Sequence, residues 1–139
     1  MTKQEKSSPD PLDAGTHAAG NRKVLIVDDD AFFLEVLYDI VSKAGYEIVG
    51  VAENGEDGVN KARLLNPDIV MLDIIMPVKN GLVAAKEIKA SHPLIKIVMC
   101  TSLKDAMFVK EADACGVSAY IKKPFSEADV LTALKGLDF

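Results

Sequence analysis

The sequence has very little cysteine. Only Cys100 and Cys115 occur among 139 residues, and their spacing is not that of a metal site or a disulfide framework. Both lie in apolar or helical segments, where cysteine is usually a reduced core thiol. We therefore expect neither a zinc centre nor a disulfide-stabilised secreted fold.

Long apolar runs are also absent. No stretch approaches the roughly 20 residues that a membrane-spanning helix needs, and residues 1–20 lack the apolar centre of a signal peptide. These absences predict a cytoplasmic protein without membrane insertion. With 49% hydrophobic residues, the chain is long enough for one core and short of what two full domains usually need.

The chain lacks an excess of basic residues as well. Lysine and arginine number 16 against 21 aspartates and glutamates, which gives a formal net charge of −5. Because binding to nucleic acid needs a basic face, direct nucleic-acid binding is not expected. The acidic cluster Asp28-Asp29-Asp30 is instead suited to attracting a divalent cation.

What the sequence does contain is a regular alternation of strand-like and helix-like segments. At its centre, residues 67–73 form an apolar run that ends in Asp73, and such runs are typical of parallel strands buried on both faces. This alternation predicts an α/β fold, a three-layer sandwich around a five-stranded parallel sheet with right-handed crossovers. The other strands are expected at 23–27, 46–52, 96–101 and 118–122, and the helices at about 31–44, 55–65, 82–90, 104–114 and from 126 onward.

Residues 1–21 differ from the rest of the chain. They contain almost no large apolar side chains, so they cannot bury enough surface to offset the entropy lost on ordering. We therefore predict a flexible N-terminal extension at 1–21, followed by a single domain at 22–139.

Reactive side chains fall at the carboxyl ends of the predicted strands. Asp28 and Asp29 follow the first strand, Asp73 ends the third, Thr101 ends the fourth and Lys123 follows the fifth. In a parallel sheet these ends share one edge, where open α/β folds bind ligands. Three neighbouring carboxylates repel one another, so without a cation at least one should have a raised pKa. With Mg²⁺, a lysine and a hydroxyl, they could hold a phosphoryl group.

The same residues carry a resemblance to a known family. In order, the chain has the acidic pair, then Asp73 within Leu72-Asp73-Ile74-Ile75-Met76-Pro77 before Asn80-Gly81, then Thr101-Ser102, Tyr120 and Lys123-Pro124-Phe125. Each motif alone is weak, but all of them in order form a specific pattern. Over about residues 22–138 the chain resembles the receiver domain of two-component response regulators, the single-domain chemotaxis type in particular. The resemblance implies a flavodoxin-like (βα)5 fold with strand order 2-1-3-4-5.

The resemblance also implies a role for each acidic residue. Asp73 would be the phosphoacceptor, which attacks the phosphorus of a phosphohistidine on a histidine kinase or a histidine phosphotransfer protein. Asp28, Asp29, Asp73 and the backbone carbonyl of Ile75 would hold Mg²⁺, or Mn²⁺ in its place. Such a domain is a regulatory phosphoacceptor that assists its own phosphorylation and dephosphorylation, and it is not counted as an enzyme.

Lys123 and two switch residues would complete the site in a similar receiver. Lys123 would pair with the phosphoryl oxygens, and its peptide bond to Pro124 would be cis. Thr101 would move towards the phosphoryl group, and Tyr120 would turn inward into the vacated space. The face formed by the last two helices and the strand between them would then change shape for a downstream protein. The protein would be a monomer or a weak phosphorylation-dependent dimer.

Two positions that vary among receivers are apolar here. They are Ile75, two residues after Asp73, and Leu103, two residues after Thr101. Because neither side chain can orient an attacking water, we predict slow hydrolysis of the aspartyl phosphate.

Other interpretations stay open on the sequence alone. The chain could be a receiver domain cut from a larger response regulator or hybrid kinase. A Mg²⁺-dependent phosphatase of the haloacid dehalogenase type also forms an aspartyl phosphate, but that family needs a second aspartate where Ile75 stands. A flavodoxin-like binding module would need serine, threonine and glycine after the first strand, where this chain has three aspartates.

Overall fold

The computed structural model describes residues 22–102 and 109–139, which form alternating strands and helices. The strands are β2 (Lys23–Val27), β3 (Glu47–Ala52), β4 (Ile69–Asp73), β5 (Lys96–Thr101) and β6 (Ala119–Lys122). The helices are α2 (Ala31–Lys43), α3 (Gly55–Leu65), α4 (Gly81–Ser91), α5 (Val109–Ala114) and α6 (Glu127–Lys135). The predicted boundaries agree to within two residues, apart from the start of the helix expected at 104–114, which lies outside the described residues.

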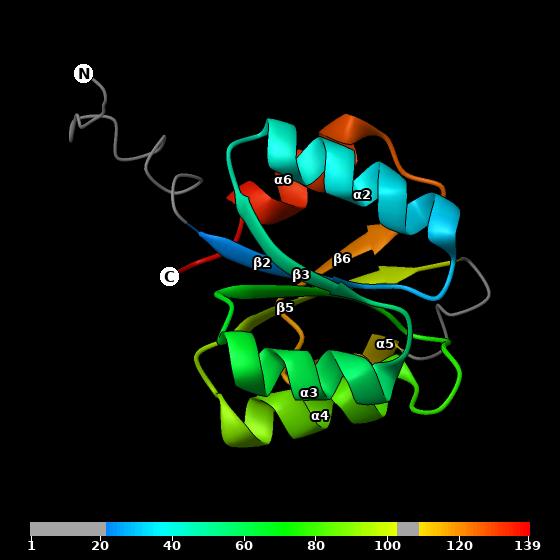
Figure 1. Ribbon diagram of the computed structural model, residues 1–139, viewed down its shortest axis with the longest axis vertical. Coiled ribbons are helices and arrows are strands. Elements are labelled where there is room, and N and C mark those ends of the chain that lie inside the picture. The colour runs from blue at the N-terminus through cyan, green and yellow to red at the C-terminus, as the bar shows by residue number, and fades with distance from the viewer. Residues whose placement is uncertain (1–21, 103–108) are drawn as a thin grey trace.

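The five strands form one parallel sheet. Their spatial order is β3-β2-β4-β5-β6, which is the order 2-1-3-4-5 when the strands are counted along the chain. Helices α2 and α6 cover one face of the sheet, and α3, α4 and α5 cover the other (Figure 1). The predicted three-layer, flavodoxin-like α/β fold is therefore confirmed.

Strand β4 lies at the centre of two cores. Val70 and Leu72 pack in the cluster on the side of α3 and α4, whereas Ile69 and Met71 pack in the cluster on the side of α2 and α6. All four side chains have 0% exposure. Because alternate side chains of a strand point to opposite faces, burial on both sides requires the unbroken apolar run seen in the sequence. Asp73 follows that run at the carboxyl edge.

Side-chain caps fix where helices begin. Asp30 accepts a hydrogen bond from a backbone N–H of α2, and Asn54 and Asn80 do the same for α3 and α4. Ser126 and Asp129 form a capping box at the start of α6. These caps follow the carboxyl ends of strands, so they also fix the loops around the acidic edge. None of the described helices has the length and apolar character needed to cross a bilayer.

Candidate functional site

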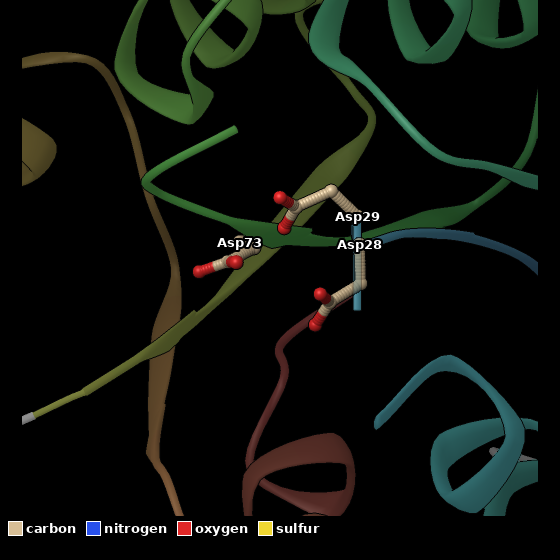
Figure 2. A group of neighbouring side chains, drawn as sticks. All are labelled: Asp28, Asp29 and Asp73. Atoms are coloured by element: carbon tan, nitrogen blue, oxygen red, sulfur yellow. The ribbon is translucent and has the colours of Figure 1, made fainter. Parts of the chain in front are cut away.

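Three acidic side chains meet at the carboxyl edge of the sheet. Carboxylate oxygens of Asp28, Asp29 and Asp73 all lie within 4.8 Å of one another (Figure 2). Asp28 and Asp29 follow β2, and Asp73 ends the adjacent strand β4. Asp28 and Asp73 are buried, and Asp29 is exposed. The predicted convergence of these carboxylates is therefore present in the fold.

Lys123 brings a positive charge into this acidic cluster. Its Nζ lies 2.9 Å from Asp28 Oδ2 and 3.3 Å from Asp73 Oδ2. Its backbone N–H donates to the carbonyl of Thr101 at 2.6 Å, which ties the residue to the end of β5. The peptide bond to Pro124 is cis, as predicted. The topology thus places the lysine that follows the edge strand β6 within 2.9 and 3.3 Å of the carboxylates at the ends of β2 and β4.

The acidic cluster changes the ionisation of Asp73. Burial raises the pKa of this carboxyl to about 6, and the charges of Asp28 and Asp29 act in the same direction, whereas Lys123 opposes them. The sequence predicts a raised pKa in this cluster, and the prediction is confirmed. Its expected cause was mutual repulsion, but removal from water is the larger effect.

The residues present fit a divalent cation. Asp28 Oδ2 is buried, and its neighbour among the described residues is the Lys123 ammonium, whose Nζ lies 2.9 Å away. Asp28 Oδ1 accepts a hydrogen bond from the backbone N–H of Asp30 at 2.9 Å, which fixes the carboxylate. Carboxylate oxygens are the hard ligands that Mg²⁺ prefers. The cluster is therefore consistent with a Mg²⁺ site.

The two predicted switch residues lie on neighbouring strands near this edge. Thr101 ends β5, is 7% exposed, and donates its hydroxyl to the carbonyl of Ser102 at 3.3 Å. Tyr120 in β6 is half-buried against the cluster on the α3–α4 side of the sheet. Its hydroxyl donates to Asp113 in α5. The tyrosine therefore links the edge strand directly to the helix that follows the 103–108 segment.

Ile75 lies in the loop between β4 and α4, two residues after Asp73. Its side chain is 58% exposed, whereas its neighbours Ile74 and Met76 are buried. The loop closes where the N–H of Gly81 donates to the carbonyl of Ile74 at 2.5 Å. This hydrogen bond holds the start of α4 to the residue after Asp73, so Ile75 lies inside a closed loop. Leu103, the other predicted determinant of hydrolysis, lies outside the described residues.

The sequence reasoning missed the contact between Phe33 and Lys123. The Lys123 ammonium lies 4.4 Å from the centre of the Phe33 ring, and that ring also packs against Phe125 at 5.5 Å. A cation over an aromatic face is attracted by the negative face of the ring. From the sequence, Phe33 is predicted only to be part of the apolar face of α2. No local pattern predicts its contact with Lys123.

Comparison with known proteins decides the family. The family described as "Response regulator receiver domain" matches residues 24–135. The chain belongs to the response regulator receiver family. It is a receiver domain for phosphorelay signalling, and as such a regulatory phosphoacceptor rather than an enzyme in the usual sense.

Chemotaxis regulators are among its similar relatives. The chain is 46% identical to the chemotaxis protein CheY of Thermotoga maritima over 113 residues, which cover 81% of this chain and 94% of that protein. It is 40% identical to the CheY of Bacillus subtilis over 112 residues, with 81% and 93% covered. The receiver family is thus as predicted, and chemotaxis proteins matched over nearly their whole length are among its relatives.

A solved structure shares the fold as well. The crystal structure of a CheX-CheY complex with BeF3 and Mg²⁺ from Borrelia burgdorferi matches with a TM-score of 0.76 and 33% identity. The match covers 81% of this chain and 86% of that one. The receiver fold therefore accounts for nearly all of the described residues.

Proposed function

We propose that this receiver accepts a phosphoryl group on Asp73 from a phosphohistidine of a histidine kinase or histidine phosphotransfer protein. The observation that supports the proposal is the convergence of one buried carboxylate at the end of the central strand with Asp28, Asp29 and Lys123. A nucleophile, a cation site and a fixed ammonium group are the parts that phosphoryl transfer requires.

Asp73 is the nucleophile in this proposal. A carboxylate oxygen of Asp73 attacks the phosphorus, the bond from phosphorus to the imidazole nitrogen breaks, and the imidazole keeps the electron pair. The product is an acyl phosphate on Asp73. Only the ionised carboxylate can attack, and with its pKa near 6 Asp73 is mostly ionised at neutral pH.

The other residues of the cluster hold and neutralise the phosphoryl group. Asp28, Asp29, Asp73 and the Ile75 carbonyl would hold Mg²⁺, which when bound supplies positive charge next to the phosphoryl oxygens. Mn²⁺ could occupy the same ligands. Lys123 already pairs with Asp73, so its ammonium has only to exchange a carboxylate oxygen for a phosphoryl oxygen. The similar Borrelia complex contains both BeF3 and Mg²⁺, which supports a cation in a receiver of this fold.

The signal would pass to a downstream protein through the face formed by α5, β6 and α6. In the proposed switch, the Thr101 hydroxyl leaves the Ser102 carbonyl for a phosphoryl oxygen. The Tyr120 ring turns inward and gives up its hydrogen bond to Asp113. That face then differs between the two states, which is the basis for a partner to distinguish them. The complex of the Borrelia CheY with CheX supports a protein partner.

We propose that the relay is cytoplasmic and that the protein is a monomer or a weak phosphorylation-dependent dimer.

The test is phosphorylation by acetyl phosphate, followed by intact mass with and without Mg²⁺. Wild type should gain one phosphoryl group only when Mg²⁺ is present, and Asp73→Asn should gain none. Asp39→Asn makes the same chemical change on the exposed side of α2 and should behave as wild type. A wild type that gains no phosphoryl group, or an Asp73→Asn variant that gains one, would contradict the proposal.

A further inference from the structure

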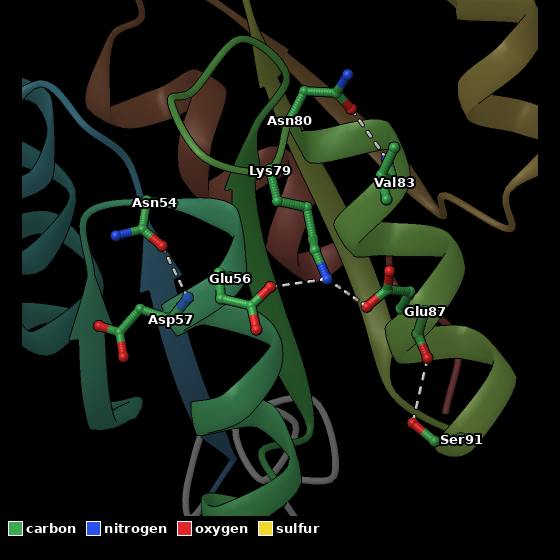
Figure 3. Close-up of polar contacts among 8 residues, drawn as sticks. All are labelled: Asn54, Glu56, Asp57, Lys79, Asn80, Val83, Glu87 and Ser91. Atoms are coloured by element: carbon green, nitrogen blue, oxygen red, sulfur yellow. Dashed lines mark hydrogen bonds and ion pairs between the residues drawn. The ribbon is translucent and has the colours of Figure 1, made fainter.

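The loop between β4 and α4 is held by an ion-pair cluster that the site does not use. Lys79 Nζ lies 3.0 Å from Glu56 Oε1 in α3 and 2.6 Å from Glu87 Oε1 in α4 (Figure 3). The Lys79 side chain is only 18% exposed, and its two partners are 51% and 37% exposed. One lysine in the loop thus joins two helices.

The backbone of this loop is pressed against its neighbours at two points. A Cβ added at Gly55, the first residue of α3, would lie 1.8 Å from the carbonyl oxygen of Lys79. A Cβ added at Gly81 would lie 2.0 Å from the carbonyl oxygen of Asp73. Only glycine can occupy either position without moving the backbone. The loop is therefore fitted closely to α3 at Lys79, and the start of α4 that follows it is fitted closely to the end of the phosphoacceptor strand.

Val78 is strained at the tip of the loop. Its φ is +71°, and the N–H of Lys79 donates to the carbonyl of Pro77 at 2.7 Å, so residues 77–79 form a γ-turn with positive φ. A β-branched residue rarely adopts this conformation, and it persists only where the surroundings enforce it. The Val78 side chain is 79% exposed and supplies little packing. Its neighbour Lys79 supplies the contacts that can hold the turn.

The helices themselves do not depend on this ion-pair cluster. Val59 and Ala62 of α3 and Ala84 and Ile88 of α4 are buried in one core cluster, which already packs these helices against the sheet. Ion pairs with exposed partners usually add little to global stability. The ion pairs of Lys79 therefore act locally, on the conformation of the loop that contains Ile75.

We propose that Lys79 is a positioning residue for the divalent cation. Through Glu56 and Glu87 it holds the strained turn, which fixes the backbone of Ile75 beside Asp73. The inference rests on the proposed function in taking the Ile75 carbonyl as a ligand. Ile74 and Met76 on either side of Ile75 are buried. Loss of Lys79 should therefore make the position of the Ile75 carbonyl less fixed without moving it away from the site. The expected effect is weaker cation binding and not its loss.

The test is a Mg²⁺ titration without phosphodonor, followed by the amide NMR shifts of Asp73 and Ile75 in ¹⁵N-labelled protein. Lys79→Met should raise the Kd for Mg²⁺ by about tenfold, the low end of what outer-shell changes cost. Lys79→Arg keeps the charge and should bind nearly as wild type does. Lys43→Met removes the Lys43–Asp39 ion pair on α2 and should leave the Kd unchanged.

A second variant covers the case in which Lys79→Met fails to fold. Glu56→Gln combined with Glu87→Gln removes the negative charges of both ion-pair partners of Lys79, at side chains that are exposed. This double variant should raise the Kd for Mg²⁺ in the same way. An unchanged Kd in the folded Lys79 and glutamate variants, or an equal rise in Lys43→Met, would overturn the role of Lys79 and leave the proposed function standing. A wild type that binds no Mg²⁺ would overturn the cation site itself, and the positioning role with it.

Discussion

The Nζ of Lys123 lies 3.3 Å from Oδ2 of Asp73, so the proposed phosphoacceptor is paired with a lysine before any phosphoryl group arrives. The pair joins the end of the central strand β4 to the residue after the edge strand β6. An ammonium group held in this position is ready for the charge that the phosphoryl oxygens bring. The contact between these two residues is therefore the basis of the first prediction.

Lys123→Met should slow phosphorylation by acetyl phosphate by about 100-fold, because removal of one charge-stabilising group typically has an effect of this size. Initial rates at saturating Mg²⁺, followed by intact mass, measure the effect. Lys122→Met is the matched control, since Lys122 is the exposed neighbour. Equal rates for wild type and Lys123→Met would show that Lys123 only balances charge in the resting protein.

The raised pKa of Asp73 predicts that stability depends on pH. The pKa is about 6 in the folded protein against an ordinary 3.8, so the folded state holds the proton more tightly than the unfolded state does. The stabilisation that protonation gives is complete below pH 3.8 and is lost as the pH rises to about 6. Above this range the ionised carboxylate lowers the free energy of unfolding by at most about 3 kcal/mol.

Asp73→Asn should therefore be more stable than wild type at pH 7.5 in EDTA, by about 1–3 kcal/mol. The difference should shrink towards zero below pH 4, where wild type is protonated as well. Urea unfolding across this pH range measures both values. A variant that is no more stable than wild type at pH 7.5 would show that Lys123 fully offsets the burial of the carboxylate.

Much of the fold and the site can be predicted from local patterns. The run that becomes β4 contributes alternate side chains to two core clusters, and only an unbroken apolar strand can do so. Once parallel strands are expected, the meeting of Asp28, Asp73 and Lys123 follows from topology, because all strand ends share one edge.

Contacts that depend on side-chain direction across the fold could not be predicted in this way. Phe33 and Lys123 lie far apart in the sequence, and their contact depends on how α2 and α6 pack together on one face of the sheet. Lys79 and Glu87 are eight residues apart. Lys79 lies in the loop before α4, so the spacing rules for side chains on one helix do not predict this ion pair. The positive φ of Val78 is set by the loop's surroundings, since a β-branched residue alone favours the opposite sign.

Ile75→Asn should shorten the lifetime of the phosphorylated protein several-fold, because an amide side chain beside Asp73 can orient water. Ile75 is 58% exposed, so the change should leave the core intact. Loss of the phosphoryl group after removal of acetyl phosphate, followed by intact mass, measures the lifetime. Leu94→Asn replaces an apolar side chain that is 89% exposed and serves as the control. Adding Leu103→Glu should shorten the lifetime further, and a wild type that loses its phosphoryl group faster than this double variant would refute the prediction.

Removal of residues 1–21 should leave both the stability and the phosphorylation rate unchanged. The buried apolar residues of the described structure run from Val24 to Leu134, so the domain predicted at 22–139 contains the whole of this core. Urea unfolding of the full chain and the shortened chain, with acetyl phosphate rates for both, measures the effect. A lower unfolding midpoint for the shortened chain would make the N-terminal segment part of the folded domain.

The most direct test of the central claim is the position of the acyl phosphate. Borohydride reduces an aspartyl phosphate to homoserine, which peptide mass spectrometry locates in the sequence. After treatment with acetyl phosphate and Mg²⁺, homoserine should appear at position 73 and at neither Asp28 nor Asp29. Homoserine at position 28 or 29, or none at position 73, would contradict the account of Asp73 as the phosphoacceptor.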